Sequence, residues 1–567
     1  MKTLRISLLF ITLLLLYTKC NAMQPPTGSD TLTFYGNELL GRPTTNSVTV
    51  HACANKNMDV YYEYGKDSLN YTLRTTNQST LDSIPFVFVL DKLNVDTKYF
   101  YRMKYRATGD TGYTARASHS FHTQRLSGES FTFAIEADPH LDTNSTPASF
   151  ALSLQNMLSQ GPDFLIDLGD TFMSEKLPSK TQAEITRRHL LLRSYWDIAC
   201  HSIPLFQVLG NHEGELGWLL NSSDTCLPVM TAKTRILFFP NPVPDSFYSG
   251  NTVSENYVGL RQNYYAFEWG NSLFMVLDPY WYTKSKPGWG WTLGTDQYNW
   301  FKNTISASKA KFKFIFCHQL VGGNGNDGRG GTEFADFYES GGKNADSTWG
   351  FSTYRPTWEK PIHQLMVDNN ATIFFHGHDH FYGKQDKDGI VYQEVPQPSN
   401  KNLKNTSAAS YGYVNGVILP GRGYLLLTIN DTSAQVQYIK TLLPSEETST
   451  SHNMDIAHSY TIVKSNSTTG VYEYSSVANT FKLNQNFPNP FNPETTIQYT
   501  IPSAANVDLE VFDVMGREVQ SIAHEFQQSG TYTVSFKAQN LSLSSGIYYY
   551  RISAGAYSEC KKMILLK

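Results

Sequence analysis

The sequence has little of several features that mark common protein classes. It has no long basic stretch, and its formal net charge is only −4 over 567 residues. Neither a nucleic-acid-binding surface nor a membrane-surface helix is therefore indicated. No cysteine pair has zinc-knuckle spacing, which argues against a structural thiolate site. Beyond the N-terminus, no apolar run is long enough to span a bilayer.

What is present is the composition of a globular protein, with 40% hydrophobic and 14% aromatic residues. The length favours two to four domains, because single hydrophobic cores stop growing well below this size. The only long apolar run, LLFITLLLLY, follows Lys2 and Arg5 and precedes Ala22. This order is typical of an export signal, so we expect residues 1–22 to be a signal peptide and the mature chain to lack a transmembrane span. An uncleaved anchor, or a lipid anchor on Cys20, is the alternative.

Five cysteines remain after Cys20, which are Cys53, Cys200, Cys226, Cys317 and Cys560. An odd number in an exported protein leaves at least one thiol unpaired or paired between chains. Cys200 and Cys226 lie in irregular polar surroundings, so a local disulfide between them fits an oxidising compartment. Cys317 adjoins His318 on a strand, and we expect it to be a buried free thiol on the opposite face.

The pattern of apolar and polar residues divides the chain after the expected signal peptide into four parts. Short alternating runs such as SVTVHA and DVYYEYG predict an antiparallel sandwich over residues 28–126. Nearly continuous apolar runs such as DFLIDLG and KFKFIFC, separated by helix-like stretches, predict an α/β or α+β core over residues 129–464. A Ser, Thr and Asn-rich segment over residues 465–480 reads as a linker. Alternating segments then predict a small all-β domain over residues 481–567.

Potential metal ligands follow five of the apolar runs of the core. In order they are Asp138 and His140, Asp170, Asn211 and His212, His318, and His378 and His380. The carboxyl ends of parallel strands meet at one edge of a sheet, which is where α/β proteins gather ligand sites. A single Asp or His there is usually a cap, but five strand ends that all supply such residues favour a common site. Oxygen and imidazole donors without thiolate suit iron, manganese or zinc.

The stretches that carry these residues are DPH, GD, GNHE, His318 and GHDH. In this order they resemble the motif set of the calcineurin-like metallophosphoesterases, which is DxH, GD, GNH[DE], H and GHxH, over about residues 131–463. The resemblance implies a β-sandwich core flanked by helices, and two divalent or mixed-valence metal ions (Fe, Mn or Zn). A hydroxide held between the ions would attack the phosphate ester. It also implies a ligand set, in which Asp138, His140 and His380 hold one ion, Asn211, His318 and His378 hold the other, and Asp170 bridges both.

The same resemblance implies roles beside the metal ions. Together with Asn211, His212 and Glu213 form the expected catalytic group. His212 would act as a general acid for the leaving alcohol or as a donor to the phosphoryl oxygens, and Glu213 would orient it. Asp142 and Asp167 either hold metal-bound histidines or serve as plain surface or cap residues.

Two further resemblances concern the flanking regions. The run LDKLNVDTKYFYRM resembles a fibronectin type III domain, and a sandwich ahead of the core resembles purple acid phosphatases. Those enzymes place a tyrosinate ligand where this chain has Met173, so we expect no such ligand here. The runs FPNPFNP, GIYYYRI and KKMILLK resemble the sorting domains of type IX secretion substrates, which implies the secretion machinery as a partner and a secreted or bacterial cell-surface location.

The sequence therefore predicts an exported phosphomonoesterase that acts on a phosphorylated small molecule. Phosphodiesterase or nucleotidase activity is equally compatible with the motif set. Arg329, in the loop GGNGNDGRGG, either lies over a phosphate or packs within the loop. The alternative from a different functional class is a non-catalytic surface adhesion protein with a vestigial core.

Overall fold

The computed structural model describes residues 32–142, 145–239, 241–325, 327–464, 473–476, 481–501, 505–527, 530–541, 543–555 and 557–566. The expected signal peptide lies outside these residues, as does most of the expected linker. The chain forms two compact units, one of Met1–Leu426 with Lys440–Asp455 and one of Leu427–Ile439 with Ile456–Lys567. No helix among the described residues is long and apolar enough to cross a membrane.

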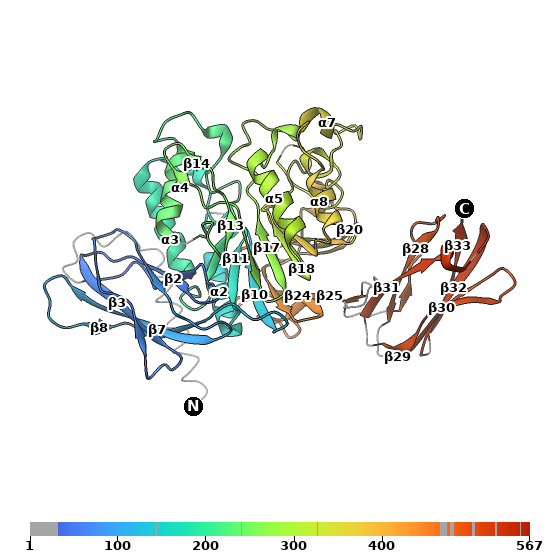
Figure 1. The fold of residues 1–567 in the computed structure, drawn as a ribbon, viewed down its shortest axis with the longest axis horizontal. Coiled ribbons are helices and arrows are strands. Elements are labelled where there is room, and N and C mark those ends of the chain that lie inside the picture. The colour runs from blue at the N-terminus through green and yellow to red at the C-terminus, as the bar shows by residue number, and fades with distance from the viewer. Residues whose placement is uncertain are drawn as a thin grey trace. The chain divides into compact units, whose positions relative to one another are not determined.

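Two sheets form the centre of the first unit (Figure 1). In one, β10 (Phe131–Glu136), β11 (Phe164–Asp167) and β12 (Leu205–Gln207) are parallel neighbours. In the other, β17 (Ser272–Val276), β18 (Phe312–Phe316), β19 (Ile373–His376) and β21 (Ile390–Glu394) are parallel neighbours. Its remaining strands are β13 (Ser249–Gly250), β16 (Tyr265–Trp269), β20 (Tyr382–Lys387) and β22 (Val417–Leu419). Every residue of β11, β12, β17, β18 and β19 is buried, which explains their continuous apolar runs.

Aromatic side chains join the two sheets face to face. The ring of Phe274 lies 5.1 Å from that of Phe133 and 5.2 Å from that of Phe164, and the rings of Phe206 and Phe267 stack at 4.4 Å between centroids. Such ring contacts add to the burial of the large apolar side chains.

Helices cover the outer faces of this sandwich (Figure 1). On one side they are α2 (Pro147–Gln160), α3 (Gln182–Trp196) and α4 (Leu227–Phe238). On the other side they are α5 (Thr295–Ala307) and α8 (Ile362–Asp368). Two further helices, α6 (Tyr338–Gly341) and α7 (Phe351–Tyr354), are short. Phe301 and Ile305 of α5 and Leu365 of α8 share a buried cluster with Ile315 and Phe374 of the second sheet. The prediction of a β-sandwich flanked by helices is thereby confirmed.

The N-terminal region is also rich in strands. β1 (Leu39–Gly41), β2 (Val48–Ala52) and β6 (Phe86–Leu90) pair antiparallel in one sheet. The second sheet contains β3 (Met58–Gly65), β4 (Leu73–Arg74), β5 (Gln78–Thr80), β7 (Lys98–Ala107), β8 (Thr114–Ala115) and β9 (His119–His122). A buried cluster that includes Val50, Tyr62 and Tyr101 packs between them.

The N-terminal region shares a sheet with the core. β1 pairs in parallel with β12, with Gly41 opposite Leu205, so its sheet continues the first sheet of the core. The Arg193 side chain of α3 is fully buried at this junction, where its Nη2 donates to the carbonyls of Asn37 and His51 at 3.0 and 2.8 Å. The two regions thus share backbone hydrogen bonds and a buried cation.

The second unit is built of strands. One sheet contains β24 (Ser433–Lys440), β25 (Ile456–Val463), β26 (Glu473–Ser476), β31 (Gly530–Lys537), β28 (Glu494–Ile501) and β27 (Lys482–Leu483). The other contains β30 (Glu518–Gln527), β29 (Ala505–Phe512), β32 (Gly546–Ala554) and β33 (Tyr557–Leu565). β26 lies inside the expected linker, where it pairs with β25 and β31.

The cysteines differ from expectation in one respect. Cys200 and Cys226 are both buried free thiols, so the disulfide considered between them is absent from the structure. Cys317 is a buried free thiol, as predicted, and burial raises its pKa. A buried thiol with a raised pKa is a poor nucleophile and a poor metal ligand.

Candidate metal centre

The loops that follow β10, β11 and β19 hold their candidate ligand residues in an unusual backbone conformation. Asp138, His140, Asp170, His378 and His380 all have positive φ, between 53° and 77°. Residues with a Cβ rarely adopt this left-handed region, at a cost of about 1–3 kcal/mol each when strained. Strain of this kind is characteristic of functional sites, and here it falls on five of the seven expected metal ligands.

The motif glycines allow these loops to touch. A Cβ on Gly210 would lie 2.3 Å from Asp170 Oδ1, and one on Gly377 would lie 2.6 Å from Asp138 Oδ2. The backbone also links the loops, because the N–H of Asp138 donates to the carbonyl of Gly169 at 2.9 Å and that of His140 donates to the carbonyl of Asp170 at 3.0 Å. The glycines of GNHE and GHDH are therefore steric requirements of the site.

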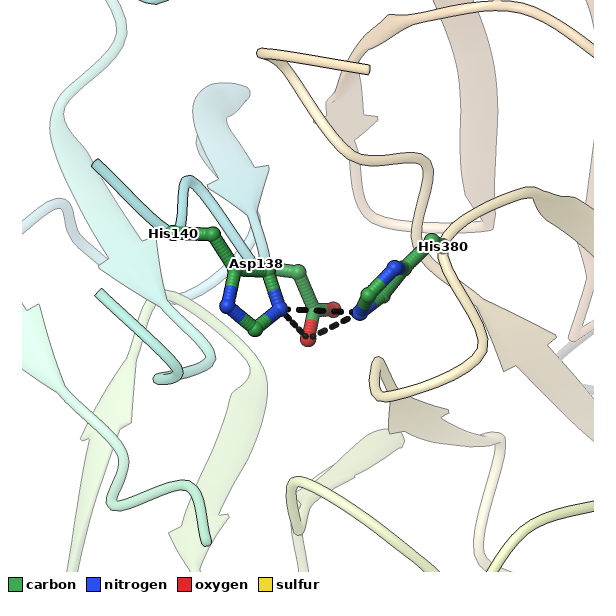
Figure 2. A group of neighbouring side chains, drawn as sticks. All are labelled: Asp138, His140 and His380. Carbon is green, nitrogen blue, oxygen red and sulfur yellow. Dashed lines mark hydrogen bonds and ion pairs between the residues drawn. The ribbon is translucent and has the colours of Figure 1, made fainter. Parts of the chain in front are cut away.

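One group of ligand atoms consists of Asp138, His140 and His380 (Figure 2). Asp138 Oδ1 lies 3.6 Å from His140 Nε2 and 3.4 Å from His380 Nε2, and the two Nε2 atoms are 2.9 Å apart. Figure 2 shows the imidazoles approaching the carboxylate from two separate loops. Asp138 is fully buried, whereas the His380 side chain is 32% exposed, so this group opens toward solvent on the His380 side.

The second group consists of Asp170, His318 and His378. Asp170 Oδ2 lies 3.0 Å from His318 Nε2 and 3.9 Å from His378 Nδ1. His318 Nε2 also lies 3.8 Å from Asp138 Oδ1, so the two groups adjoin. Within each group the ligand atoms all lie within 4.8 Å of one another, which is close enough to share one metal ion.

Several of these atoms are buried without a hydrogen-bond partner. Asp138 Oδ1 and Asn211 Oδ1 have none, and Asp170 Oδ2 and His318 Nε2 have only ion pairs, including their mutual one at 3.0 Å. An unpaired buried polar atom costs about 1–3 kcal/mol, so a cluster of them calls for a ligand. Oxygen and imidazole nitrogen atoms in this arrangement fit a first-row transition-metal ion.

The electrostatics of the cluster also favour positive charge. Burial alone would lower the pKa of His318, but Asp170 and Asp138 raise it to about 10. Burial alone would raise the pKa of Asp170, yet His318 and His212 hold it well below the usual range. The carboxylates thus stay ionised in a buried site, and a bound cation meets the same demand with the histidines neutral.

Hydrogen bonds from outside the cluster orient the imidazoles. His318 Nδ1 donates to the carbonyl of Leu168 at 2.8 Å, and His378 Nε2 donates to the carbonyl of Asp327 at 2.9 Å. Each bond turns the other ring nitrogen toward Asp170. Carbonyl partners of this kind fix the tautomer and orientation of metal-binding histidines.

His212 lies beside the cluster with a partner that differs from the expected one. Its Nδ1 is hydrogen-bonded to Glu175 Oε1, and its Nε2 lies 3.9 Å from Asp170 Oδ2. Burial opposes protonation, but Asp170 and Glu175 raise the pKa of His212. Glu175 belongs to a short 3-10 turn over Ser174–Lys176 and carried no motif in the sequence.

Glu213 is not the residue that orients His212. Its two carboxylate oxygens accept four hydrogen bonds, from the N–H groups of Gly210, Asp170 and Thr171 and from the Thr171 hydroxyl, at 2.6–3.0 Å. These contacts tie the GNHE loop to the GD loop. The expectation for Glu213 is corrected accordingly, because its carboxylate acts on the backbone that carries Asp170.

Asp167 and Asp142, which the sequence left open as histidine partners or plain surface or cap residues, have different surroundings. Asp167 faces Glu136 in register across β10 and β11, and both are fully buried. Burial, with the neighbouring carboxylate, raises the pKa of Asp167 well above its usual range, and burial raises that of Glu136 to about 8. The main chain of Asp142 exchanges hydrogen bonds with the Ser145 hydroxyl at 2.9 and 3.1 Å.

Comparison with known proteins finds two matching family models. A family model described as calcineurin-like phosphoesterase matches residues 131–382, and one described as a secretion system C-terminal sorting domain matches residues 485–566. No curated protein sequence matches the chain significantly.

Solved structures show the same fold. The structure of PhoD superposes with a TM-score of 0.57 at 14% sequence identity, covering 79% of this chain and 92% of PhoD. A purple acid phosphatase from yellow lupin (Lupinus luteus) seeds superposes with a TM-score of 0.52 at 14% identity, covering 77% of this chain and 75% of that one. At such low identity these likenesses concern the fold alone.

Proposed function

Residues 131–382 form a calcineurin-like phosphoesterase domain, and from this premise we propose that the protein is a dinuclear phosphomonoesterase. The domain makes the protein a metal-dependent phosphoester hydrolase, and the sorting domain at residues 485–566 makes it a secreted or cell-surface protein. The number of metal ions, the residues that bind them and the preference for monoesters are the parts that we propose.

The observation that carries the proposal is the pair of adjoining buried ligand groups with unpartnered donor atoms. Asp138, His140 and His380 would bind one ion, and His318 and His378 would bind the other together with Asn211, whose buried Oδ1 lacks a hydrogen-bond partner. Asp170 would bridge the ions, as the resemblance of the motifs implies, and its Oδ2 faces the imidazoles of the second group. Two ions so placed would lower the pKa of water to give a nucleophile near neutral pH and would neutralise charge on the phosphate.

His212 would supply a proton to the leaving alcohol. Burial opposes protonation, but Asp170 and Glu175 raise the pKa of His212, which favours the protonated imidazole, and its side chain is 17% exposed at the edge of the cluster. The N–H of His212 donates to Asp170 Oδ1 at 2.7 Å, which holds the residue beside the centre. General acids of this type contribute roughly 10²–10⁴-fold to rate.

A substrate panel on the purified protein tests the proposal. The protein would be treated with a chelator, restored with manganese, iron or zinc singly, and assayed on phosphate monoesters and diesters of matched leaving groups. We expect hydrolysis to vanish on chelation, to return with metal ions at two per chain, and to favour monoesters. A preference for diesters would overturn the monoester assignment, and a wild-type protein that binds two ions without hydrolysing any ester would favour the adhesion alternative.

A further inference from the structure

Asp379 lies between the two histidines of GHDH. It has no role in the proposed chemistry, but its carboxylate accepts several hydrogen bonds. Its carboxylate is buried, with the residue 4% exposed. It accepts hydrogen bonds from Arg329 Nη1 at 2.9 Å, from the N–H of Gly330 at 2.9 Å and from the Tyr413 hydroxyl at 2.8 Å. It thus joins the GHDH loop to two other loops of the chain.

Arg329 extends this set of contacts to a ligand residue. Its Nη1 also donates to the carbonyl of His378 at 2.6 Å, and its guanidinium lies 4.4 Å above the ring of Tyr411. Arg329 therefore does not lie free over the metal centre, as one of the two sequence interpretations had it. It binds the backbone of the loop that carries His378 and His380.

The segment that Arg329 and Gly330 anchor also orients His378. Asp327, two residues before Arg329, offers the carbonyl to which His378 Nε2 donates at 2.9 Å. The segment has little conformational preference of its own, because Gly323, Gly325, Gly328 and Gly330 all adopt positive φ. A glycine-rich segment loses much entropy when it is ordered, so its position depends on its contacts.

We propose that Asp379 is a positioning residue, which holds the glycine-rich segment so that the Asp327 carbonyl fixes the His378 imidazole toward Asp170. This inference rests on the proposed metal centre. Without the carboxylate, the Arg329 guanidinium and the Gly330 N–H lose their partner, the segment moves, and the imidazole loses its orienting acceptor. The metal ion bound through His378 should then be held more weakly, whereas the Asp138, His140 and His380 group is affected less.

Binding of Co²⁺ measures how tightly each metal ion is held, and it does not depend on catalytic turnover. Equilibrium dialysis and the visible d–d spectrum would be compared for the wild type, D379A, D379N and D327A. We expect D379A to weaken one of two Co²⁺ binding steps by roughly 10–100-fold, as loss of contacts around metal ligands generally does. D379N keeps an acceptor oxygen and should lose less, and D327A keeps the main-chain carbonyl and should bind Co²⁺ as the wild type does.

A matched control separates positioning from general destabilisation. Asp163 is 5% exposed and accepts two hydrogen bonds from Arg125, at 2.9 and 2.8 Å, far from this segment in sequence. D163A should lower the thermal stability without changing either Co²⁺ binding step.

Each outcome has a distinct meaning. A wild-type protein that binds fewer than two Co²⁺ ions would overturn the proposed dinuclear centre. Two wild-type steps that D379A leaves unchanged would overturn the positioning role alone. If D379A does not fold, D379N and R329A test the positioning role instead. R329A removes the guanidinium that Asp379 binds, so it should weaken the same Co²⁺ binding step, and an R329A protein with both steps unchanged would overturn the role.

Discussion

The imidazole of His212 is held between two carboxylates, with Nδ1 hydrogen-bonded to Glu175 and Nε2 3.9 Å from Asp170 Oδ2. The two acids have different tasks in the proposed mechanism, since Asp170 belongs to the metal centre and Glu175 does not. A carboxylate on Nδ1 fixes the tautomer and leaves Nε2 directed at the centre. Glu175 is thus placed to orient the proposed general acid.

Substitution of Glu175 should slow the chemical step in proportion to leaving-group difficulty. Glu175→Ala removes the Nδ1 partner, so we expect kcat on esters with poor leaving groups to fall by an amount below the roughly 10²–10⁴-fold loss from removal of a general acid. Glu175→Gln keeps a hydrogen-bonding side chain and should lose less. Steady-state kinetics on esters of graded leaving-group pKa would show it. Equal losses across the series would contradict an orienting role.

Two buried aspartates near the end of β11 should respond differently to the same isosteric change. Asp170→Asn removes the charge that faces His318 and His378, so we expect loss of metal and of hydrolysis together. Asp167→Asn changes a carboxyl whose pKa burial raises well above its usual range, which disfavours the charged form, so we expect metal content to stay near the wild-type value. Metal analysis and turnover on the two variants, measured side by side, make the comparison. Loss of metal in both would show that Asp167 carries charge in the native protein.

The strand pattern of the sequence indicates where the candidate ligands lie, because each expected ligand follows a buried strand or lies in the loop after one. Asp138 follows β10, Asp170 follows β11 and His318 follows β18, so a strand prediction also places its ligand at the common edge. The continuous apolar runs revealed these strands, since both faces of the sheets are covered.

The remaining features depend on contacts between distant residues and have no local pattern. Gly41 pairs with Leu205 across 164 positions, so nothing in either segment alone indicates that the N-terminal sheet continues into the core. Glu175 is an isolated acid in a short turn, and only the fold brings it to His212. Glu213 was assigned to its sequence neighbour, whereas its carboxylate turns back to the loop that carries Asp170.

The metal centre should lack the colour of a tyrosinate-bound ferric ion. Met173 stands at the position where purple acid phosphatases place a tyrosine, and a thioether is no hard anionic donor. We expect iron-reconstituted protein to show no phenolate-to-iron band in its visible spectrum and to hydrolyse esters with divalent manganese, iron or zinc. A purple wild-type preparation would contradict the ligand assignment; Met173→Tyr provides the comparison spectrum.

Removal of the sorting domain should separate export from catalysis. A chain that ends at residue 480 lacks the matched region 485–566 but keeps every proposed metal ligand. We expect hydrolysis by the purified truncated protein with kcat near the wild-type value, and retention of the protein within the envelope of its native cell. Cell fractionation measures the second effect. Truncated protein recovered outside the cell in wild-type amounts would speak against this sorting role.

The junction between the N-terminal region and the core should weaken in acid through His51. Its Nε2 donates to the carbonyl of Leu237 at 2.8 Å and its Nδ1 lies 3.1 Å from Arg193 Nη1, which requires a neutral ring with Nδ1 as acceptor. Burial, followed by the charge of Arg193, lowers the pKa of His51 from 6.5 to about 3. Below pH 6.5 the His51 imidazole binds a proton in the unfolded chain but stays neutral in the folded chain.

The stability contributed by a neutral His51 is therefore complete above pH 6.5 and falls as the pH drops from there toward the folded pKa of about 3. The slope from one such group is about 1.4 kcal/mol of unfolding free energy per pH unit. A glutamine side chain offers the same donor and acceptor without titrating, so His51→Gln should reduce the slope between pH 6 and pH 4 by about that amount. Urea unfolding of both proteins across this range measures the difference. Parallel stability curves would show that His51 takes up its proton in the folded protein as readily as in the unfolded chain.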